Sequence, residues 1–78
     1  MRHVRDILNE IKWREELSFD DLEIEYRDRV ESRLITLFGT EIKEWDKSFI
    51  YTITGGAIPY HRIVSITHKG QELYHHTK

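Results

Sequence analysis

The strongest β-strand signal in the chain is the stretch FIYTITGG, residues 49–56. Aromatic and β-branched residues fill its first six positions, and such residues favour the pleated sheet. Both glycines at the end can adopt positive φ, so Gly55-Gly56 predicts a two-residue hairpin turn. The stretch therefore predicts a strand over residues 49–54 that is followed closely by an antiparallel neighbour.

Further strands are predicted on both sides of this stretch. Residues 22–26 alternate between apolar and charged side chains, which indicates a strand with one face in water. Residues 34–38 are apolar on both faces and end at Gly39, which predicts an interior strand. A turn at Lys69-Gly70 would join the last two strands. The remaining predicted strands lie at residues 42–45, 62–68 and 71–75.

The segment before these strands has a helical pattern. Over residues 3–14 the apolar side chains fall at positions i, i+3, i+4 and i+7, namely Val4, Ile7, Leu8 and Ile11. Residues 18–21 resemble a capping box without a following apolar pattern, which predicts a single helical turn. Because short turns between strands favour antiparallel pairing, we predict an α+β fold: an N-terminal helix packed on a curled, mainly antiparallel sheet of about five to six strands.

The length and composition narrow the class of protein. A chain of 78 residues has room for one hydrophobic core, so we expect a single domain over residues 1–78. The chain contains no cysteine, which excludes disulfides and thiolate zinc sites. It has no apolar run as long as a signal peptide or a membrane span. We therefore expect a cytoplasmic protein that does not associate with membranes.

Charge is distributed unevenly along the chain. Residues 1–46 carry eight Lys and Arg against thirteen Asp and Glu, whereas residues 47–78 carry four against one. An acidic protein is a poor non-specific binder of nucleic acid, because that binding requires many phosphate contacts. The basic second part could still hold one phosphate or one end of a strand. The alternative is that this asymmetry only reflects uneven surface charge.

The stretch IPYHRI, residues 58–63, contains the best candidate for a binding site. Arginine offers a rigid fork of donors to a phosphate, and histidine adds another donor. Strict strand alternation would turn Arg62 toward the core, where Asp28 could pair with it. Alternatively, Pro59 marks a bulge or the start of a strand, and His61 and Arg62 both face a phosphate at one rim.

Several aromatic residues could stack on an RNA base, although most aromatics in a small domain are core residues. Tyr60 is the best of them because it adjoins the His-Arg pair. The others are Tyr26, Trp13 and Trp45. A second basic group comprises Arg27, Arg29 and Arg33, for which a solvated face with surface ion pairs is the simpler interpretation.

Signals for catalysis are sparse. Ribonuclease-type transphosphorylation needs a general acid and a general base about one phosphate, and His61 with His68 or His75 is the available combination. A zinc site made of histidines is a further alternative, using His61, His68, His75 and His76. No P-loop, nucleophile elbow or dinucleotide fingerprint occurs. We expect a binding module rather than an enzyme, without a metal or other cofactor.

Several short motifs together resemble a known family over nearly the whole chain. The most specific is the stretch at residues 58–63, followed by Ile66 and Gly70. The others are Ile7-Leu8, Ile11-Lys12-Trp13, Ile24-Glu25-Tyr26, Asp28-Arg29 and Gly39-Thr40-Glu41-Ile42. With these motifs the chain resembles the RNA cyclic-group-end recognition domain, a family of short archaeal-type proteins formerly classed as a domain of unknown function.

This resemblance implies a function and a set of site residues. The family is proposed to bind RNA ending in a 2′,3′-cyclic phosphate, alone or fused to RNA end-processing enzymes, which would then be partners in RNA processing. By position, His61 and Arg62 would contact the phosphate, and three residues would line or support the site: Tyr26, Asp28 and Arg29. The chain departs from the family at Val30, where a small residue or glycine is usual. The two alternatives are a phosphodiesterase that opens the cyclic end and a protein-interaction module using residues 34–38.

Overall fold

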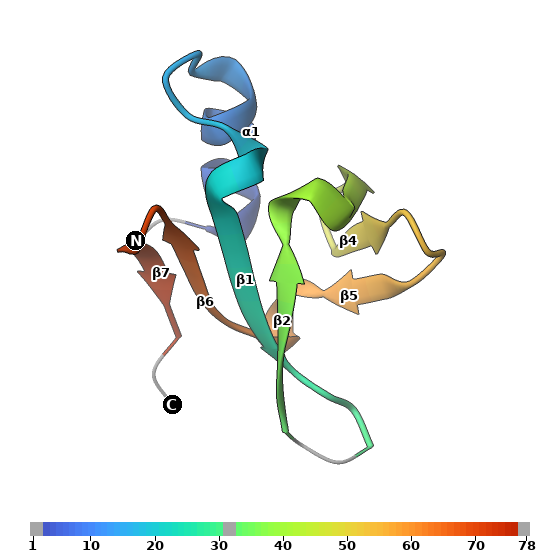
Figure 1. Ribbon diagram of the computed structural model, residues 1–78. Helices are drawn as coiled ribbons and strands as arrows, with labels where there is room; N and C mark the ends of the chain where they lie inside the picture. Colours follow the sequence, from blue (N-terminus) through green and yellow to red (C-terminus); the bar gives the residue numbers. More distant parts are fainter. Residues whose placement is uncertain (1–2, 31–32, 77–78) are drawn as a thin grey trace.

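The computed structural model describes residues 3–30 and 33–76, which form one α-helix, three short 3₁₀ turns and seven strands (Figure 1). The helical elements are α1 (Val4–Trp13), η1 (Phe19–Asp21), η2 (Gly39–Glu41) and η3 (Tyr60–Arg62). The strands are β1 (Leu22–Arg27), β2 (Leu34–Phe38), β3 (Ile42–Trp45), β4 (Phe49–Thr52), β5 (Ala57–Pro59), β6 (Ile63–His68) and β7 (Gln71–His75). Within the described ranges, no helix is long and apolar enough to cross a membrane.

The strands form two antiparallel sheets rather than one curled sheet. The larger has the order β2-β1-β6-β7 and the smaller has the order β3-β4-β5. The chain passes from one sheet to the other at two 3₁₀ turns, because η2 follows β2 and η3 precedes β6. The predicted α+β class, with an N-terminal helix and antiparallel strands, is confirmed. The division into two sheets places η3 at a junction between them.

One hydrophobic core joins the helix to both sheets. The apolar face of α1 is buried through Val4, Ile7, Leu8 and Ile11, as its periodicity predicts. These residues pack with buried side chains of both sheets, namely Leu22, Ile24, Leu37, Ile50, Ile58, Ile63 and Ile66. Burying one such side chain contributes about 1.5–3 kcal/mol. The core therefore holds both sheets, and hence η3, in a defined arrangement.

The prediction that residues 34–38 form an interior strand is wrong. β2 is the edge strand of the larger sheet and pairs only with β1 among the described strands. Its apolar run is only partly buried: Leu37 is in the core, but Leu34 and Phe38 are 48% and 50% exposed. Apolar residues on both faces predict burial above and below a strand, but they do not show whether another strand lies beside it.

The two predicted hairpin turns have different outcomes. Lys69 and Gly70 form the predicted two-residue turn, since both have positive φ, at 52° and 80°. The prediction of a two-residue turn at Gly55-Gly56 is wrong, because residues 53–56 all lie between β4 and β5. Thr52 closes this longer connection: its backbone N–H donates to the Gly56 carbonyl at 2.9 Å, and its hydroxyl accepts from the Gly56 N–H at 2.9 Å.

Candidate functional site

His61 and Arg62 lie in the 3₁₀ turn η3, not in a strand. The flanking residues Ile58 and Ile63 are buried, with exposed fractions of 6% and 1%, and anchor the turn at both ends. Pro59 is the last residue of β5, which explains why the strand ends there. The alternative in which strict strand alternation turns Arg62 toward the core therefore loses its premise, because neither residue is in a strand.

A groove of about 630 Å³ opens between the two sheets. Its walls come from the end of β1, from β2, from the β4–β5 hairpin and from η3. The predicted ligand-binding residues that line it are Tyr26, Asp28, Arg29, His61 and Arg62. Residues that are distant in sequence thus meet in one groove, because β1 pairs antiparallel with β6 and brings Tyr26 opposite Ile63.

Arg62 is half-buried in this groove and has no partner among the described residues. It forms no hydrogen bond or ion pair with any of them, so the internal pair with Asp28 is not formed. The Asp28 backbone N–H donates to the Arg33 carbonyl at 2.8 Å, which holds the end of the β1–β2 hairpin together. A partly desolvated guanidinium without a counter-charge is unfavourable, and an anion in the groove would relieve that cost.

Tyr60 faces a different part of the surface. Its hydroxyl donates to the Asp46 carbonyl, and its backbone N–H donates to the Ser48 carbonyl at 3.1 Å. Burial raises the pKa of Tyr60 to about 12, and the nearby Asp46 carboxylate adds to the effect. Tyr60 lines a neighbouring hollow together with His61 rather than the groove that contains Arg62. These contacts tie η3 to the β3–β4 turn.

The remaining histidines occupy several distinct places. His68 is buried at the opposite end of β6, where its Nε2 lies 3.1 Å from the Ser18 carbonyl oxygen, so it is too distant to act with His61. His75 lies 3.6 Å from a Glu72 carboxylate oxygen. His75 and His76 do line a shallow cleft together with His61 and Arg62. No group of three metal-ligating side chains occurs among residues 3–30 and 33–76.

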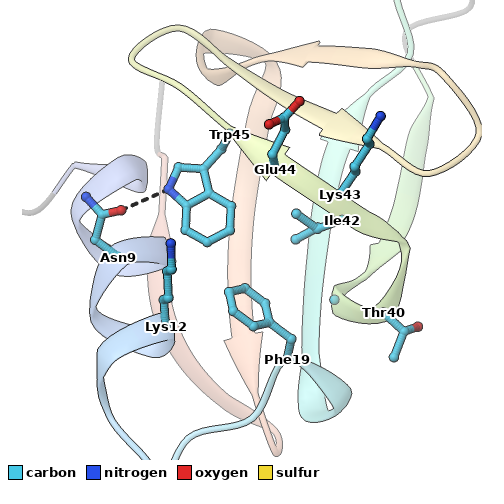
Figure 2. A pocket seen from close by; sticks show the side chains of 9 residues that line it. Asn9, Lys12, Phe19, Thr40, Ile42, Lys43, Glu44 and Trp45 are labelled. Carbon is cyan, nitrogen blue, oxygen red and sulfur yellow. Dashed lines mark hydrogen bonds between the residues drawn. The ribbon is translucent and has the colours of Figure 1, made fainter.

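The two tryptophans lie away from the groove. Trp13 is 80% exposed at the end of α1. Trp45 lines a pocket between α1 and β3, where its indole N–H donates to Asn9 at 2.9 Å (Figure 2). Its ring centroid is 5.5 Å from that of Phe19, and the Lys12 amine is 6.0 Å from the Trp45 centroid. These contacts give Trp45 a structural role. Sequence reasoning missed the pocket because its lining comes from four separate elements, α1, η1, η2 and β3.

The second basic group lies around the β1–β2 hairpin. Arg27 and Arg29 line the groove, and Arg27 and Arg33 take part in interactions within the chain. Val30, at the position where the family usually has a small residue, is 87% exposed. An exposed position tolerates a larger side chain, so this departure does not disturb the groove.

Comparisons with known proteins show the family of the chain. A family model described as the MJ1316 RNA cyclic group end recognition domain matches residues 1–76. A protein of Archaeoglobus fulgidus named UPF0248 protein is 38% identical over 66 residues, which cover 85% of this chain and 93% of the relative. No solved structure matches the chain. The match over nearly every residue, from α1 to the end of β7, shows that the chain belongs to the MJ1316 RNA cyclic group end recognition domain family.

Proposed function

We propose that the groove between the sheets binds the 2′,3′-cyclic phosphate end of an RNA and that Arg62 and His61 contact the phosphate. The main support is the state of Arg62, which is half-buried in the groove without a partner among the described residues. The family name supports RNA cyclic-group ends as the ligand class. Arg62 would bind two phosphate oxygens through its fork, and His61 would donate one further hydrogen bond.

The charge of the groove suits a monoanion. A 2′,3′-cyclic phosphate carries one negative charge, whereas a terminal phosphate monoester is partly dianionic near neutral pH. Asp28 lines the same groove as Arg62 and contributes a negative charge. This charge opposes the additional charge of a monoester and would thereby favour the cyclic end. Asp28 would also orient Arg62 or His61 once the ligand has bound.

The aromatic wall of the groove assigns a role to Tyr26. Tyr26 is half-buried on β1 and lines the groove with His61 and Arg62, which supports the proposal that it stacks on the terminal base. Tyr60 was the other stacking candidate, but it does not line the groove and its hydroxyl is bonded to the Asp46 carbonyl. We therefore favour Tyr26 for stacking and a positioning role for Tyr60. Arg29, exposed at the rim, would contribute charge.

Short RNAs of one sequence that end in 2′,3′-cyclic phosphate, 3′-phosphate or 3′-hydroxyl test this proposal by fluorescence anisotropy. We expect the cyclic end to bind most tightly and Arg62→Gln to remove that preference. Lys69→Gln, which removes one charge at the far β6–β7 turn, is the matched control and should bind like the wild type. Equal or negligible binding of all three RNAs would overturn the proposal.

Analysis of the recovered RNA by chromatography separates recognition from catalysis. We propose that the domain recognises the cyclic end without opening it, as a cytoplasmic module for RNA-processing enzymes. Appearance of a ring-opened end would instead favour a phosphodiesterase, with His61 and either His75 or His76 as acid and base in their shared cleft. If no RNA binds, the edge strand β2 with its exposed Leu34 and Phe38 favours a protein-interaction module.

A further inference from the structure

We propose that a second phosphate subsite lies at Lys47 and holds the phosphodiester group immediately before the terminal nucleotide of the RNA. This subsite rests on the proposed function, because it describes the path of an RNA strand whose terminal phosphate is bound at Arg62. A hollow of about 500 Å³ adjoins the groove, and His61 lines both. The side chains of this Lys47 hollow include His3, Lys47, Tyr60, His61, Tyr74 and His76.

The lining of the Lys47 hollow suits an anion. None of the described residues that line it is acidic, although the chain as a whole is acidic. Lys47 is exposed and forms no ion pair with any residue in the described part of the chain. A lysine amine together with histidine donors is a suitable environment for a phosphodiester, which carries one negative charge.

The carboxylate of Asp46, the residue before Lys47, is directed into its own turn. Its Oδ1 accepts the backbone N–H groups of Ser48 and Phe49 at 2.8 and 2.9 Å, and its Oδ2 accepts the Tyr51 hydroxyl at 2.7 Å. These hydrogen bonds stabilise the charged carboxylate and lower the pKa of Asp46. They also fix the conformation of the turn that carries Lys47, so Asp46 serves to position Lys47.

The Lys47 hollow and the groove are built as one unit. Both hydrogen bonds of Tyr60, to Asp46 and Ser48, join the β3–β4 turn to η3, which carries His61 and Arg62. On the other side, the His76 backbone N–H donates to the Val64 carbonyl at 2.7 Å, which holds His76 beside the start of β6. Two cationic sites at a fixed separation are preorganised for consecutive phosphates of one strand, because little ordering is needed on binding.

A different course for the strand would cross the β1–β2 hairpin, which is also basic. There Arg27 and Arg33 already take part in interactions within the chain. Contacts from these side chains to RNA would compete with those interactions. Lys47 forms no ion pair with any described residue, and its electrostatic neighbour Asp46 already accepts hydrogen bonds within its own turn. The geometry therefore favours a strand that leaves the groove past His61.

Calorimetric titration of the full chain tests the subsite with two probes, uridine 2′,3′-cyclic monophosphate and the uridine dinucleotide with the same cyclic end. The dinucleotide adds one phosphodiester, and we expect wild-type protein to bind it about three- to tenfold more tightly. Lys47→Gln should abolish this gain and leave the mononucleotide affinity unchanged. For the dinucleotide, it should also reduce the slope of log K against log salt by about 0.7, the value for one phosphate on a single strand.

Lys43→Gln is the matched control, because it removes the same charge from β3, where Lys43 lines the Trp45 pocket instead (Figure 2). It should retain the gain, and so should Arg33→Gln. The subsite would be overturned if the higher affinity for the dinucleotide persists in Lys47→Gln. It would also be overturned if Lys43→Gln or Arg33→Gln removes that higher affinity equally. If the mononucleotide binds through Arg62 but the gain does not depend on Lys47, only the subsite fails. If neither probe binds the wild type, the proposed function fails and the subsite with it.

Discussion

Two histidines near opposite ends of strand β6 lie in contrasting environments. His68 is the last residue of the strand, and His61 lies in η3 just before its first residue. At one end, His68 is 6% exposed and lies within hydrogen-bonding distance of the Ser18 backbone, while Phe19 packs against Gly39. We call these four residues the closed end. At the other end, His61 is exposed and Arg62 is half-buried, and neither has a partner among the described residues.

We call this second region, Tyr26, Asp28, Arg29, His61 and Arg62, the open end. The comparison shows that residue type alone does not decide a role. A histidine whose ring nitrogen is satisfied by the backbone serves the fold, whereas a partly desolvated cation without a partner is available to a ligand. The closed end should therefore determine stability and the open end should determine binding.

The largest expected effect on stability is at Gly39. A Cβ at this position would lie 2.0 Å from the Phe19 carbonyl oxygen and 2.9 Å from the Leu22 Cβ. We expect Gly39→Ala to lower the free energy of unfolding by about 3 kcal/mol, because the backbone must move to relieve the clash. Denaturant unfolding of this variant measures the loss.

Gly56→Ala is the counterpart in the groove that the open end lines. There the nearest atom to the added Cβ is the Thr52 hydroxyl at 3.1 Å. Its cost should be about 1 kcal/mol or less, because a side chain can shift more easily than the backbone. An equal loss of stability in the two variants would contradict the distinction between the ends.

Substitution of Arg62 should have the largest effect on binding. We expect Arg62→Gln to weaken binding of the cyclic-end RNA by about 1.5–3 kcal/mol, the usual contribution of hydrogen bonds to a charged group. The free energy of unfolding should change by less than about 0.5 kcal/mol, since no partner among the described residues is lost. A large loss of stability with unchanged affinity would instead indicate a structural role for Arg62.

Substitutions of His68 at the end of β6 and of His61 in η3 should have opposite effects on stability and binding. His68→Ala should lower the free energy of unfolding by about 1–3 kcal/mol, because it removes a buried side chain together with its hydrogen bond to the Ser18 backbone. The folded variant should still bind RNA. His61→Ala should leave stability nearly unchanged and weaken binding. Thermal unfolding and anisotropy on the same samples test both statements, and matching results for the two variants would count against them.

The smallest expected effect concerns the hydrogen bond from the Tyr60 hydroxyl to the Asp46 carbonyl. Tyr60→Phe removes the hydrogen bond to Asp46 and should cost about 0.5–1.5 kcal/mol at neutral pH. The pKa of Tyr60 is raised to about 12, so its neutral form is favoured in the folded protein. The resulting stabilisation is fully present below the unfolded pKa of about 10 and is lost as the pH rises through the folded pKa.

Unfolding measured between pH 10 and 12 should therefore show a steeper loss of stability in the wild type than in Tyr60→Phe. Comparing the two proteins cancels the titration of the lysines and of Tyr51. Parallel curves for the two proteins would show that Tyr60 does not titrate in the way its burial requires.

Local patterns in the sequence predict the local elements well. The spacing of apolar residues predicts α1, and the glycine after Lys69 predicts the β6–β7 turn, because both depend on neighbouring residues. The edge position of β2 and the division into two sheets depend on which distant strands pair. The contact between His68 and Ser18 joins residues fifty positions apart, and no local pattern could indicate it.

The candidate site was predictable in part for the same reason. Family resemblance selected residues of β1 and η3, and strand pairing brings them into one groove. The 3₁₀ turn at residues 60–62 was not predicted, because three residues are too few to show a period. The sequence also did not single out Lys47, the residue of the proposed subsite, since its place depends on the hydrogen bonds between the β3–β4 turn and Tyr60.

The central claim, that the open end binds the RNA end and the closed end serves the fold, is tested most directly by nuclear magnetic resonance. Uridine 2′,3′-cyclic monophosphate would be titrated into isotope-labelled full chain, and backbone amide shifts would be followed. We predict saturable shifts at Tyr26, Arg29, His61 and Arg62, and none at Ser18 or His68. Shifts confined to the closed end or to the Trp45 pocket, or no shifts at all, would contradict the account.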